Sequence, residues 1–415
     1  MSSGNSSLRV LVNDHSGHPF QVQLSRSLAR RGHTVLHTYC RSFLTPRGSL
    51  ERKAEDPGGF AVKGIALDDA FDKYNLVRRW LHERELGWRL NKVVREFAPD
   101  VVVSSNTPLI TQALLQAEAR RLGAGFVFWM QDAFGVGYRN ALRRQLLIGG
   151  DFLGRGFQWY EQRLLARSDE VVVITDDFLS YLPMPIRRRN VATVIENWAP
   201  LDELPLKEKQ NDWSIQLGLD ASFNFLYSGT LGLKHNPNLL IDLAKAVAGQ
   251  AHARVVVVSE GPGAQWLAEH KQTEGLSNLV LLPFQPFEAM PNVLASADVL
   301  LTLLEKDAGA YAVPSKVLTY LCAQRPLLLA VPSQNLSAKI VRENAAGLTV
   351  DPDDAVGFMS AGLALLANSE QRKIYARNGR AYAERTFHIE QITDRFEDLI
   401  TRIATAKATA NTRIA

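Results

Sequence analysis

The chain has 415 residues, 46% of them hydrophobic and 22% charged. This composition excludes fibrous, disordered and disulfide-stapled proteins and leaves room for two or three globular domains. The net charge of +4 is compatible with nucleic acid, anionic lipid or phosphorylated substrates, so by itself it selects none of them. The longest uncharged stretch, 101–117, contains polar residues and a proline, so it cannot supply the roughly 20 apolar residues of a transmembrane helix. The Ser-rich start predicts no signal peptide, and we expect a cytoplasmic protein.

Strand-length apolar runs alternate with helical patterns along the first half, which indicates an α/β protein with parallel strands. We predict strands over 8–13, 34–39, 101–104, 125–130, 171–175 and 191–195. Helices are predicted over 19–31, 74–97 and 109–122. The strands are nearly continuous Val, Ile, Leu and Phe, as expected where helices cover both faces of a sheet.

A polar, proline-bearing stretch then interrupts the pattern, and a second alternation begins. Its strands are predicted over 224–228, 254–259, 278–283, 298–303, 326–331 and 347–350, and only helical patterns follow residue 351. We therefore predict an N-terminal Rossmann-like domain over 1–197, a linker over 198–220, a C-terminal Rossmann-like domain over 221–385 and a helical tail over 386–415.

Ligands of open parallel sheets bind beyond the carboxyl ends of the strands, so two facing domains would form a cleft lined by strand-to-helix loops. The loop after the first strand of the second half contains Gly229, Gly232 and Lys234, and Asn236 with Pro237 suits a helix start. Backbone N–H groups at a helix start together with a lysine predict a phosphate site. A structural turn with a solvated lysine is the alternative.

A second loop of this kind precedes an apolar helix that reaches residue 323. Gly309 gives the chain before this helix more conformational freedom, Ser315 suits a helix start, and Lys316 adds a positive charge in the first turn. A lysine there opposes the helix dipole, and an anionic ligand would remove the conflict. Two such loops predict a diphosphate held from both sides, with simple helix capping as the alternative.

Two further loops of the second half suit a base and a ribose. Glu260, followed by Gly261, could accept protons from ribose hydroxyls, and the backbone around Phe284 could meet a base edge. Ordinary turns are an equally good explanation. No histidine or cysteine spacing typical of a metal site occurs in the sequence, and we expect neither a metal nor another cofactor.

In the first half, two strand ends carry candidate polar groups. Gly17 permits close approach to a ligand after the first strand, where His15 and His18 are candidate contacts. Asp132 follows the strand over 125–130 and could orient a sugar hydroxyl or the acceptor. Surface histidines without a role and a helix-capping aspartate are the alternatives.

The ordered set of these motifs resembles the family 4 glycosyltransferases of the GT-B fold, in particular the bacterial capsule, colanic-acid and O-antigen transferases. The segments that carry the resemblance are HSGHPF at 15–20, LARRGH at 28–33, FWMQD at 128–132, VITD at 173–176, IENW at 195–198, YSGTLG at 227–232, PSKVLTY at 314–320 and QRP at 324–326.

The resemblance implies two Rossmann-like, doubly wound domains that face a cleft, with the C-terminal tail packing back on the N-terminal domain. It also implies a nucleotide-diphosphate sugar donor in the C-terminal domain and an acceptor mainly on the N-terminal one. Asp132, Lys234 and Lys316 are the predicted catalytic residues. The predicted donor-binding residues are Gly17, His18, Gly229, Thr230, Glu260, Gly261, Phe284, Gly309, Ser315 and Val317.

The sequence also departs from the family pattern at three places. Tyr311 and Thr319 stand near the positions of a usual pair of glutamates, Thr230 replaces an arginine, and the region of Asp132 lacks a frequent histidine. The expected activity is retaining, metal-independent transfer from a UDP-linked sugar to a polyprenyl-diphosphate-linked saccharide for capsule or O-antigen. A GT-B nucleotide-sugar 2-epimerase and a non-catalytic nucleotide-sugar or lipid-binding scaffold are the alternatives.

The positive charge is concentrated in one predicted helix. Residues 73–92 hold six Lys or Arg against two Glu, with Trp80 and Trp88 between them. A basic, Trp-bearing helix suits an anionic membrane surface, and Arg78, Arg79 and Trp80 are the predicted contacts. We expect a peripheral protein on the inner face of the cytoplasmic membrane and no nucleic-acid partner. A solvated helix with buried tryptophans is the alternative.

Overall fold

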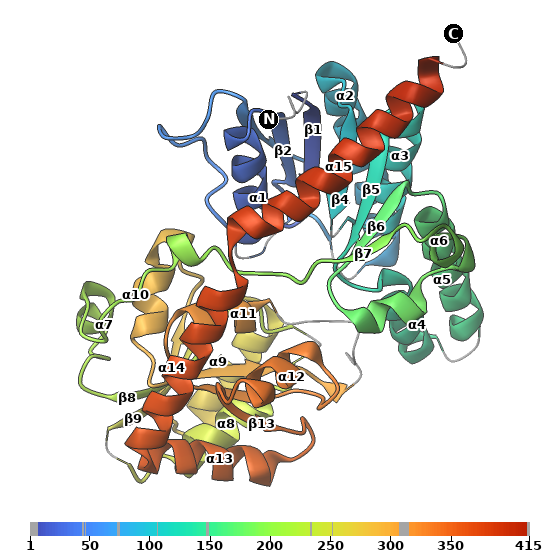
Figure 1. Cartoon of the computed structure of the whole chain (residues 1–415). Coiled ribbons are helices and arrows are strands. Elements are labelled where there is room, and N and C mark those ends of the chain that lie inside the picture. Colours follow the sequence, from blue (N-terminus) through green and yellow to red (C-terminus); the bar gives the residue numbers. More distant parts are fainter. Residues whose placement is uncertain are drawn as a thin grey trace. The chain divides into compact units, whose positions relative to one another are not determined.

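The computed structural model describes residues 7–43, 45, 47–72, 75–105, 107–146, 149–232, 235–250, 252–306 and 315–412. The chain divides into two compact units (Figure 1). Unit 1 comprises Met1–Glu196 and Ile389–Ala415, and unit 2 comprises Asn197–His388. Each unit is built on one sheet with helices around it, which confirms the predicted pair of Rossmann-like domains.

The sheet of unit 1 has the order β3-β2-β1-β4-β5-β6-β7, with parallel pairing throughout. Its strands are β1 (Arg9–Asp14), β2 (Thr34–Cys40), β3 (Phe60–Ile65), β4 (Val101–Ser105), β5 (Gly125–Met130), β6 (Glu170–Val173) and β7 (Ala192–Val194). The strand order reverses between β1 and β4, so the loop after β1 opens at the switch point where doubly wound sheets bind ligands. Gly17 and His18 lie in this loop.

Helices cover both faces of this sheet, as its apolar strands require. They are α1 (Pro19–Arg30), α2 (Leu76–Phe97), α3 (Leu109–Arg121), α4 (Phe134–Gln145), α5 (Gly150–Ala166), the 3-10 helix η1 (Asp176–Tyr181) and α6 (Met184–Arg189). Helices α4 and α5 form an antiparallel pair joined by a short connection (Figure 1).

The last helix, α15 (Ile389–Thr412), completes unit 1 although it follows unit 2 in sequence. In Figure 1 it runs as a red helix across α1 and the sheet. Phe396 packs on Trp129 of β5 at 4.7 Å between ring centroids, and Arg31 pairs with Glu397 at 2.6 Å. The predicted packing of the tail on the N-terminal domain is confirmed.

The sheet of unit 2 has the order β10-β9-β8-β11-β12-β13, also parallel. Its strands are β8 (Phe223–Ser228), β9 (Ala253–Val258), β10 (Leu279–Leu282), β11 (Val299–Leu303), β12 (Leu327–Ala330) and β13 (Gly347–Val350). The order reverses between β8 and β11, so the loops after these two strands share the switch point.

The helices of unit 2 surround a core that is centred on β8, β9 and β11. They are the 3-10 helices η2 (Leu201–Glu203) and η3 (Phe287–Ala289), and α7 (Asp212–Gln216), α8 (Asn238–Ala246), α9 (Pro262–Thr273), α10 (Met290–Ala295), α11 (Lys316–Cys322), α12 (Leu336–Glu343), α13 (Ala355–Ala367) and α14 (Ser369–Thr386).

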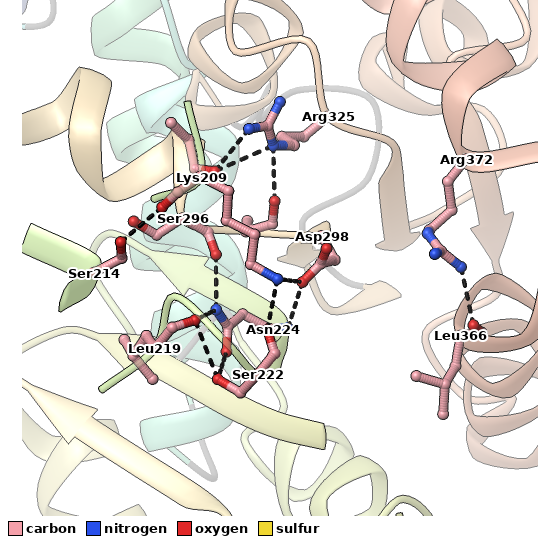
Figure 2. Close-up of polar contacts among 12 residues, drawn as sticks. Lys209, Ser214, Leu219, Ser222, Asn224, Ser296, Asp298, Arg325, Leu366 and Arg372 are labelled. Atoms are coloured by element: carbon pink, nitrogen blue, oxygen red, sulfur yellow. Dashed lines mark hydrogen bonds and ion pairs between the residues drawn. The ribbon is translucent and has the colours of Figure 1, made fainter. Parts of the chain in front are cut away.

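The stretch predicted as a linker, 198–220, belongs to unit 2 and is bound to its sheet (Figure 2). The ammonium of Lys209 donates to the Asp298 carboxylate and to the Ser222 carbonyl, each at 2.5 Å. The buried Asn224 side chain donates to the Leu219 carbonyl at 2.7 Å. These bonds explain why a polar, proline-bearing sequence is nevertheless ordered here.

Strand β3 is absent from the predicted elements. It lies at the edge of the sheet and pairs only with β2 among the described strands, and only its first and last residues, Phe60 and Ile65, are buried. The sequence FAVKGI therefore lacks the continuous apolar run by which the central strands of this chain were predicted.

Candidate functional site

The carboxyl end of β8 brings Tyr227, Gly229 and Lys316 together. The Lys316 amine lies 2.5 Å from the Tyr227 hydroxyl and 3.8 Å from the centre of the Tyr227 ring. Gly229 has a φ of +131°, and a Cβ added to it would stand 3.2 Å from the Lys316 amine. A glycine at this position therefore leaves bare backbone directly beside the amine.

Burial lowers the pKa of Lys316 to about 7. The amine contacts an aromatic face and a hydroxyl, both of which are neutral, and the removal of water disfavours its charged form. Part of the residue remains accessible. Since no carboxylate is paired with this amine among the described residues, an anion placed here would stabilise its charged form.

The PSKVLTY segment is fixed to the end of β8 by a second tyrosine. The Tyr320 hydroxyl accepts a hydrogen bond from the Ser228 N–H at 2.8 Å and donates one to the Ser228 carbonyl at 2.9 Å. Tyr320 is buried. Helix α11 therefore holds a fixed position relative to β8, and Lys316 at its start is held over Gly229.

The other predicted donor-binding residues near Lys316 differ in how accessible they are. The Thr230 carbonyl accepts the Tyr227 hydroxyl proton at 2.7 Å. Ser315 is exposed, whereas the side chain of Val317 is buried in the core and only its backbone can meet a ligand. Lys234 and Gly309 lie outside the described residues.

Glu260 and Phe284, predicted for ribose and base recognition, contact each other. The Glu260 carboxylate accepts the Phe284 N–H at 3.1 Å. Gly261 has a φ of +101° and begins α9, a conformation that favours glycine. The two loops therefore form one edge beyond β9 and β10, and one carboxylate oxygen of Glu260 is already engaged there.

In unit 1, the buried Asp14 pairs with the half-buried His18 just after β1. The Asp14 carboxylate accepts the backbone N–H of His18 and lies 3.1 Å from its Nδ1. Burial alone would raise the pKa of Asp14, but His18 lowers it overall. Burial likewise opposes charge on His18, and Asp14 together with Asp132 raises its pKa. The charge of Asp132 thus acts on His18, although the two residues follow different strands.

Gly17 has a structural reason to be glycine. Its φ is +79°, and an added Cβ would stand 2.6 Å from the Cδ1 of Leu50. The Gly17 carbonyl accepts the Gly48 N–H at 3.0 Å. The loop around residues 47–50 therefore packs on Gly17, which explains this glycine independently of any ligand.

The charge of Asp132 acts on a buried carboxyl group that is not among the predicted site residues. Glu161 of α5 is fully buried and accepts the Gly135 N–H at the start of α4 at 3.0 Å and the Tyr181 hydroxyl at 2.5 Å. Burial, supported by the charge of Asp132, raises the pKa of Glu161 to about 7. The first turn of α4 is thus capped by Glu161, not by Asp132 as the capping alternative supposed.

The basic helix α2 presents one accessible apolar face. Trp80 is 44% exposed and Trp88 57%, and the Arg84 guanidinium lies over both rings, 4.5 and 5.0 Å from their centres. Arg78 is exposed, whereas Arg79 turns inward to pair with the buried Glu83 at 2.9 Å. The tryptophans predicted to meet a surface are therefore accessible, and Arg79 has a structural partner.

The described part of the chain contains no helix both long and apolar enough to cross a bilayer. In the same part of the chain, no three or more His, Cys, Asp or Glu side chains are grouped so that they could hold a metal ion.

Comparison with known proteins gives two family models that cover most of the chain. The model of the glycosyl transferase 4-like domain matches residues 18–198, and that of glycosyl transferases group 1 matches residues 222–368. The putative colanic acid biosynthesis glycosyl transferase WcaI of Escherichia coli is 25% identical over 172 residues, which are 41% of this chain and 41% of WcaI. The match thus spans about two fifths of that relative.

Solved structures share the fold. HepE of Anabaena, in complex with UDP and glucose, has a TM-score of 0.68 at 13% identity and covers 95% of this chain and 100% of its own. WaaG, a glycosyltransferase involved in lipopolysaccharide biosynthesis, has a TM-score of 0.67 at 15% identity over 94% of this chain and 99% of its own. At identities of 13% and 15%, the structural similarity shows that these proteins share a two-domain fold with this chain.

Proposed function

The chain belongs to the family 4 glycosyltransferases of the GT-B fold, and from this premise we propose that it transfers a sugar from a nucleotide-diphosphate sugar to a lipid-linked saccharide. The donor is UDP-linked and binds at the end of β8 in unit 2. The acceptor is a polyprenyl-diphosphate-linked saccharide and binds to unit 1. The product belongs to a cell-surface polysaccharide such as a capsule or an O-antigen. The family relationship to WcaI and the UDP bound to HepE support this choice.

The observation that carries the proposal is the Lys316 amine over the bare backbone of Gly229. When a nucleoside diphosphate leaves the sugar, negative charge grows on its β-phosphate. A cation already fixed at that point stabilises the transition state without reorganisation. Tyr227 and Tyr320 hold the lysine and its helix in place, so the amine is in position before the donor arrives, and the donor phosphates favour its charged form.

The reaction is a retaining, metal-independent transfer. The bond between the anomeric carbon and the β-phosphate oxygen breaks, and the acceptor oxygen forms its bond to the same face of that carbon. The acceptor proton passes to the departing phosphate, which therefore acts as the base. Lys316 and Lys234 supply the positive charge that a divalent cation would otherwise supply.

Asp132 and His18 belong to the acceptor side of the proposal. The carboxylate of Asp14 contacts His18, and the charges of Asp14 and Asp132 both favour the charged form of His18 by raising its pKa. A charged imidazole suits a phosphate-bearing acceptor, and Asp132 suits the orientation of a sugar hydroxyl. No cofactor is required beyond the nucleotide-sugar substrate.

Contact with an anionic membrane would bring the enzyme to a lipid-linked acceptor. Trp80 and Trp88 are accessible on one face of α2, and Arg84 lies across both rings. An aromatic and basic face of this kind suits the headgroup region of an anionic bilayer. We place the protein peripherally on the inner face of the cytoplasmic membrane.

The test measures UDP release with and without a polyprenyl-diphosphate-linked sugar. Acceptor-dependent release supports transfer, isomerisation without acceptor would mean a 2-epimerase, and no turnover with any donor would mean a binding scaffold. Lys316→Ala should lower transfer by about 100-fold or more, while the exposed Lys373→Ala on α14 serves as a matched control. Activity of Lys316→Ala near the wild-type value would overturn the phosphate assignment, and loss of activity in EDTA would overturn metal independence.

A further inference from the structure

The start of α4 is held by a buried carboxyl group that the proposed reaction does not use. Glu161 projects from α5, and its Oε2 accepts both the Gly135 N–H at 3.0 Å and the Tyr181 hydroxyl at 2.5 Å. Three elements, α4, α5 and η1, therefore meet at one oxygen atom. The other oxygen, Oε1, is buried and has no hydrogen-bond partner among the described residues.

Gly135 makes this junction tight. A Cβ added there would stand 2.7 Å from the Cα of Gln158 and 2.9 Å from the Oε2 of Glu161. The first turn of α4 thus lies in direct contact with α5, and any larger residue would push the two helices apart. Asp132 lies three residues before Gly135, in the turn that leads into α4 at Phe134.

We propose that Glu161 is a positioning residue of the acceptor site: through the Gly135 N–H and the Tyr181 hydroxyl it fixes the turn between β5 and α4, and so fixes the position of Asp132 in that turn. This proposal rests on the transfer reaction proposed above, in which Asp132 and His18 serve the acceptor. Glu161 acts through Asp132 and does not itself touch the substrates.

The charge state of Glu161 matters because Asp132 is close. Burial and the charge of Asp132 raise the pKa of Glu161 to about 7, and the hydrogen bonds from Tyr181, Gly135 and Phe134 oppose that rise. The titratable groups that interact with Glu161 are Asp132, Tyr138 of α4 and Tyr181 of η1. When Glu161 ionises, its buried negative charge repels the charge of Asp132, and this repulsion disturbs the turn.

Two substitutions separate the geometry from the charge. Glu161→Gln keeps an oxygen that accepts both hydrogen bonds but cannot ionise, whereas Glu161→Ala removes the bonds. Tyr181→Phe removes a donor that lowers the pKa of Glu161, so it should move ionisation to higher pH. The exposed Glu55→Gln is the control for loss of a carboxylate.

The experiment measures UDP release against pH at saturating donor, so that titration of Lys316 in the free enzyme does not contribute. Wild-type kcat should fall as pH rises above about 7. The fall should approach about tenfold per pH unit, which is the steepest dependence that the loss of one essential proton can give. Glu161→Gln should remove this fall, Tyr181→Phe should shift it upward in pH, and Glu161→Ala should lower kcat and raise the KM for acceptor with the donor KM unchanged. An unchanged fall in Glu161→Gln, or wild-type kinetics in Glu161→Ala, would overturn the proposal.

Hydrogen exchange keeps the proposal testable apart from the reaction. Amides of residues 131–138 should lose protection in Glu161→Ala and keep it in Glu161→Gln and Glu55→Gln. If the wild type turns over no donor, the proposed transfer fails, and the role of Glu161 at this turn is then decided by exchange alone. Equal protection of these amides in wild type and Glu161→Ala would overturn it.

Discussion

Binding of UDP to this protein should take up a proton at Lys316. In the free protein burial lowers the pKa of Lys316 to about 7, from an ordinary value of 10.5. A diphosphate beside the amine favours the charged form and raises that pKa again. If the bound amine is fully charged, each UDP should take up about 0.1 proton at pH 6, about 0.5 at pH 7 and about 0.9 at pH 8.

The sign of the linkage fixes how affinity depends on pH. Because the bound form holds more protons, the affinity for UDP should fall as pH rises above about 7, by up to about tenfold per unit. Isothermal titration calorimetry in phosphate and in Tris measures the uptake, since the two buffers differ in ionisation enthalpy. At pH 8 the phosphates of free UDP are already ionised, so the measured proton belongs to the protein.

Lys316→Arg is the matched control for this measurement. Its guanidinium stays charged at all these pH values, so it should bind UDP without proton uptake. Uptake of less than about 0.2 proton at pH 8 in the wild type would refute the reasoning. Equal uptake in Lys316→Arg would refute it as well, because the proton would then bind elsewhere.

Three further results are expected. The pKa of Glu161 is about 7 in the folded state, against an ordinary 4.5, so between these pH values the folded state holds a proton that the unfolded state has lost. The free energy of unfolding should therefore fall by about 3 kcal/mol between pH 4.5 and pH 8. Urea unfolding should show a smaller fall in Glu161→Gln. Gly17→Ala should cost about 1–3 kcal/mol because of its positive φ and the Leu50 contact, and an unchanged melting temperature would contradict it. Trp80→Ser combined with Trp88→Ser should weaken cosedimentation with vesicles that contain phosphatidylglycerol, and equal binding by the double variant would remove α2 from the membrane contact.

The architecture was predictable because the central strands leave a strong signal. Strands buried on both faces read as continuous apolar runs, and β5 and β9 were predicted to within a residue of their ends. Edge strands carry a weaker signal, and β3 was missed for that reason. The stretch at 198–220 was read from its composition as a linker, but its order depends on Lys209 reaching Asp298, 89 residues away. Composition contains no record of such a contact.

The candidate site was predictable where a loop and its motif coincide. YSGTLG and PSKVLTY each contain a residue of the group around Lys316, so both could be selected before their contact was known. Glu161 could not, because it lies inside a helix of mixed polar and apolar residues and belongs to no motif. Its partners are 26 residues before it and 20 after it. The one indication in the sequence was a charged residue on the side of α5 that faces the protein interior.

Helix α15 has a consequence for synthesis on the ribosome. The Trp129 ring of β5 packs on Phe396, and Gly125 leaves space that the Ile403 side chain fills. Both partners are translated only after all of unit 2 has been made. The N-terminal unit therefore emerges first but cannot bury its core until α15 arrives, and unit 2 can finish folding before it. During this interval the apolar surface around β5 stays open to chaperones and to aggregation.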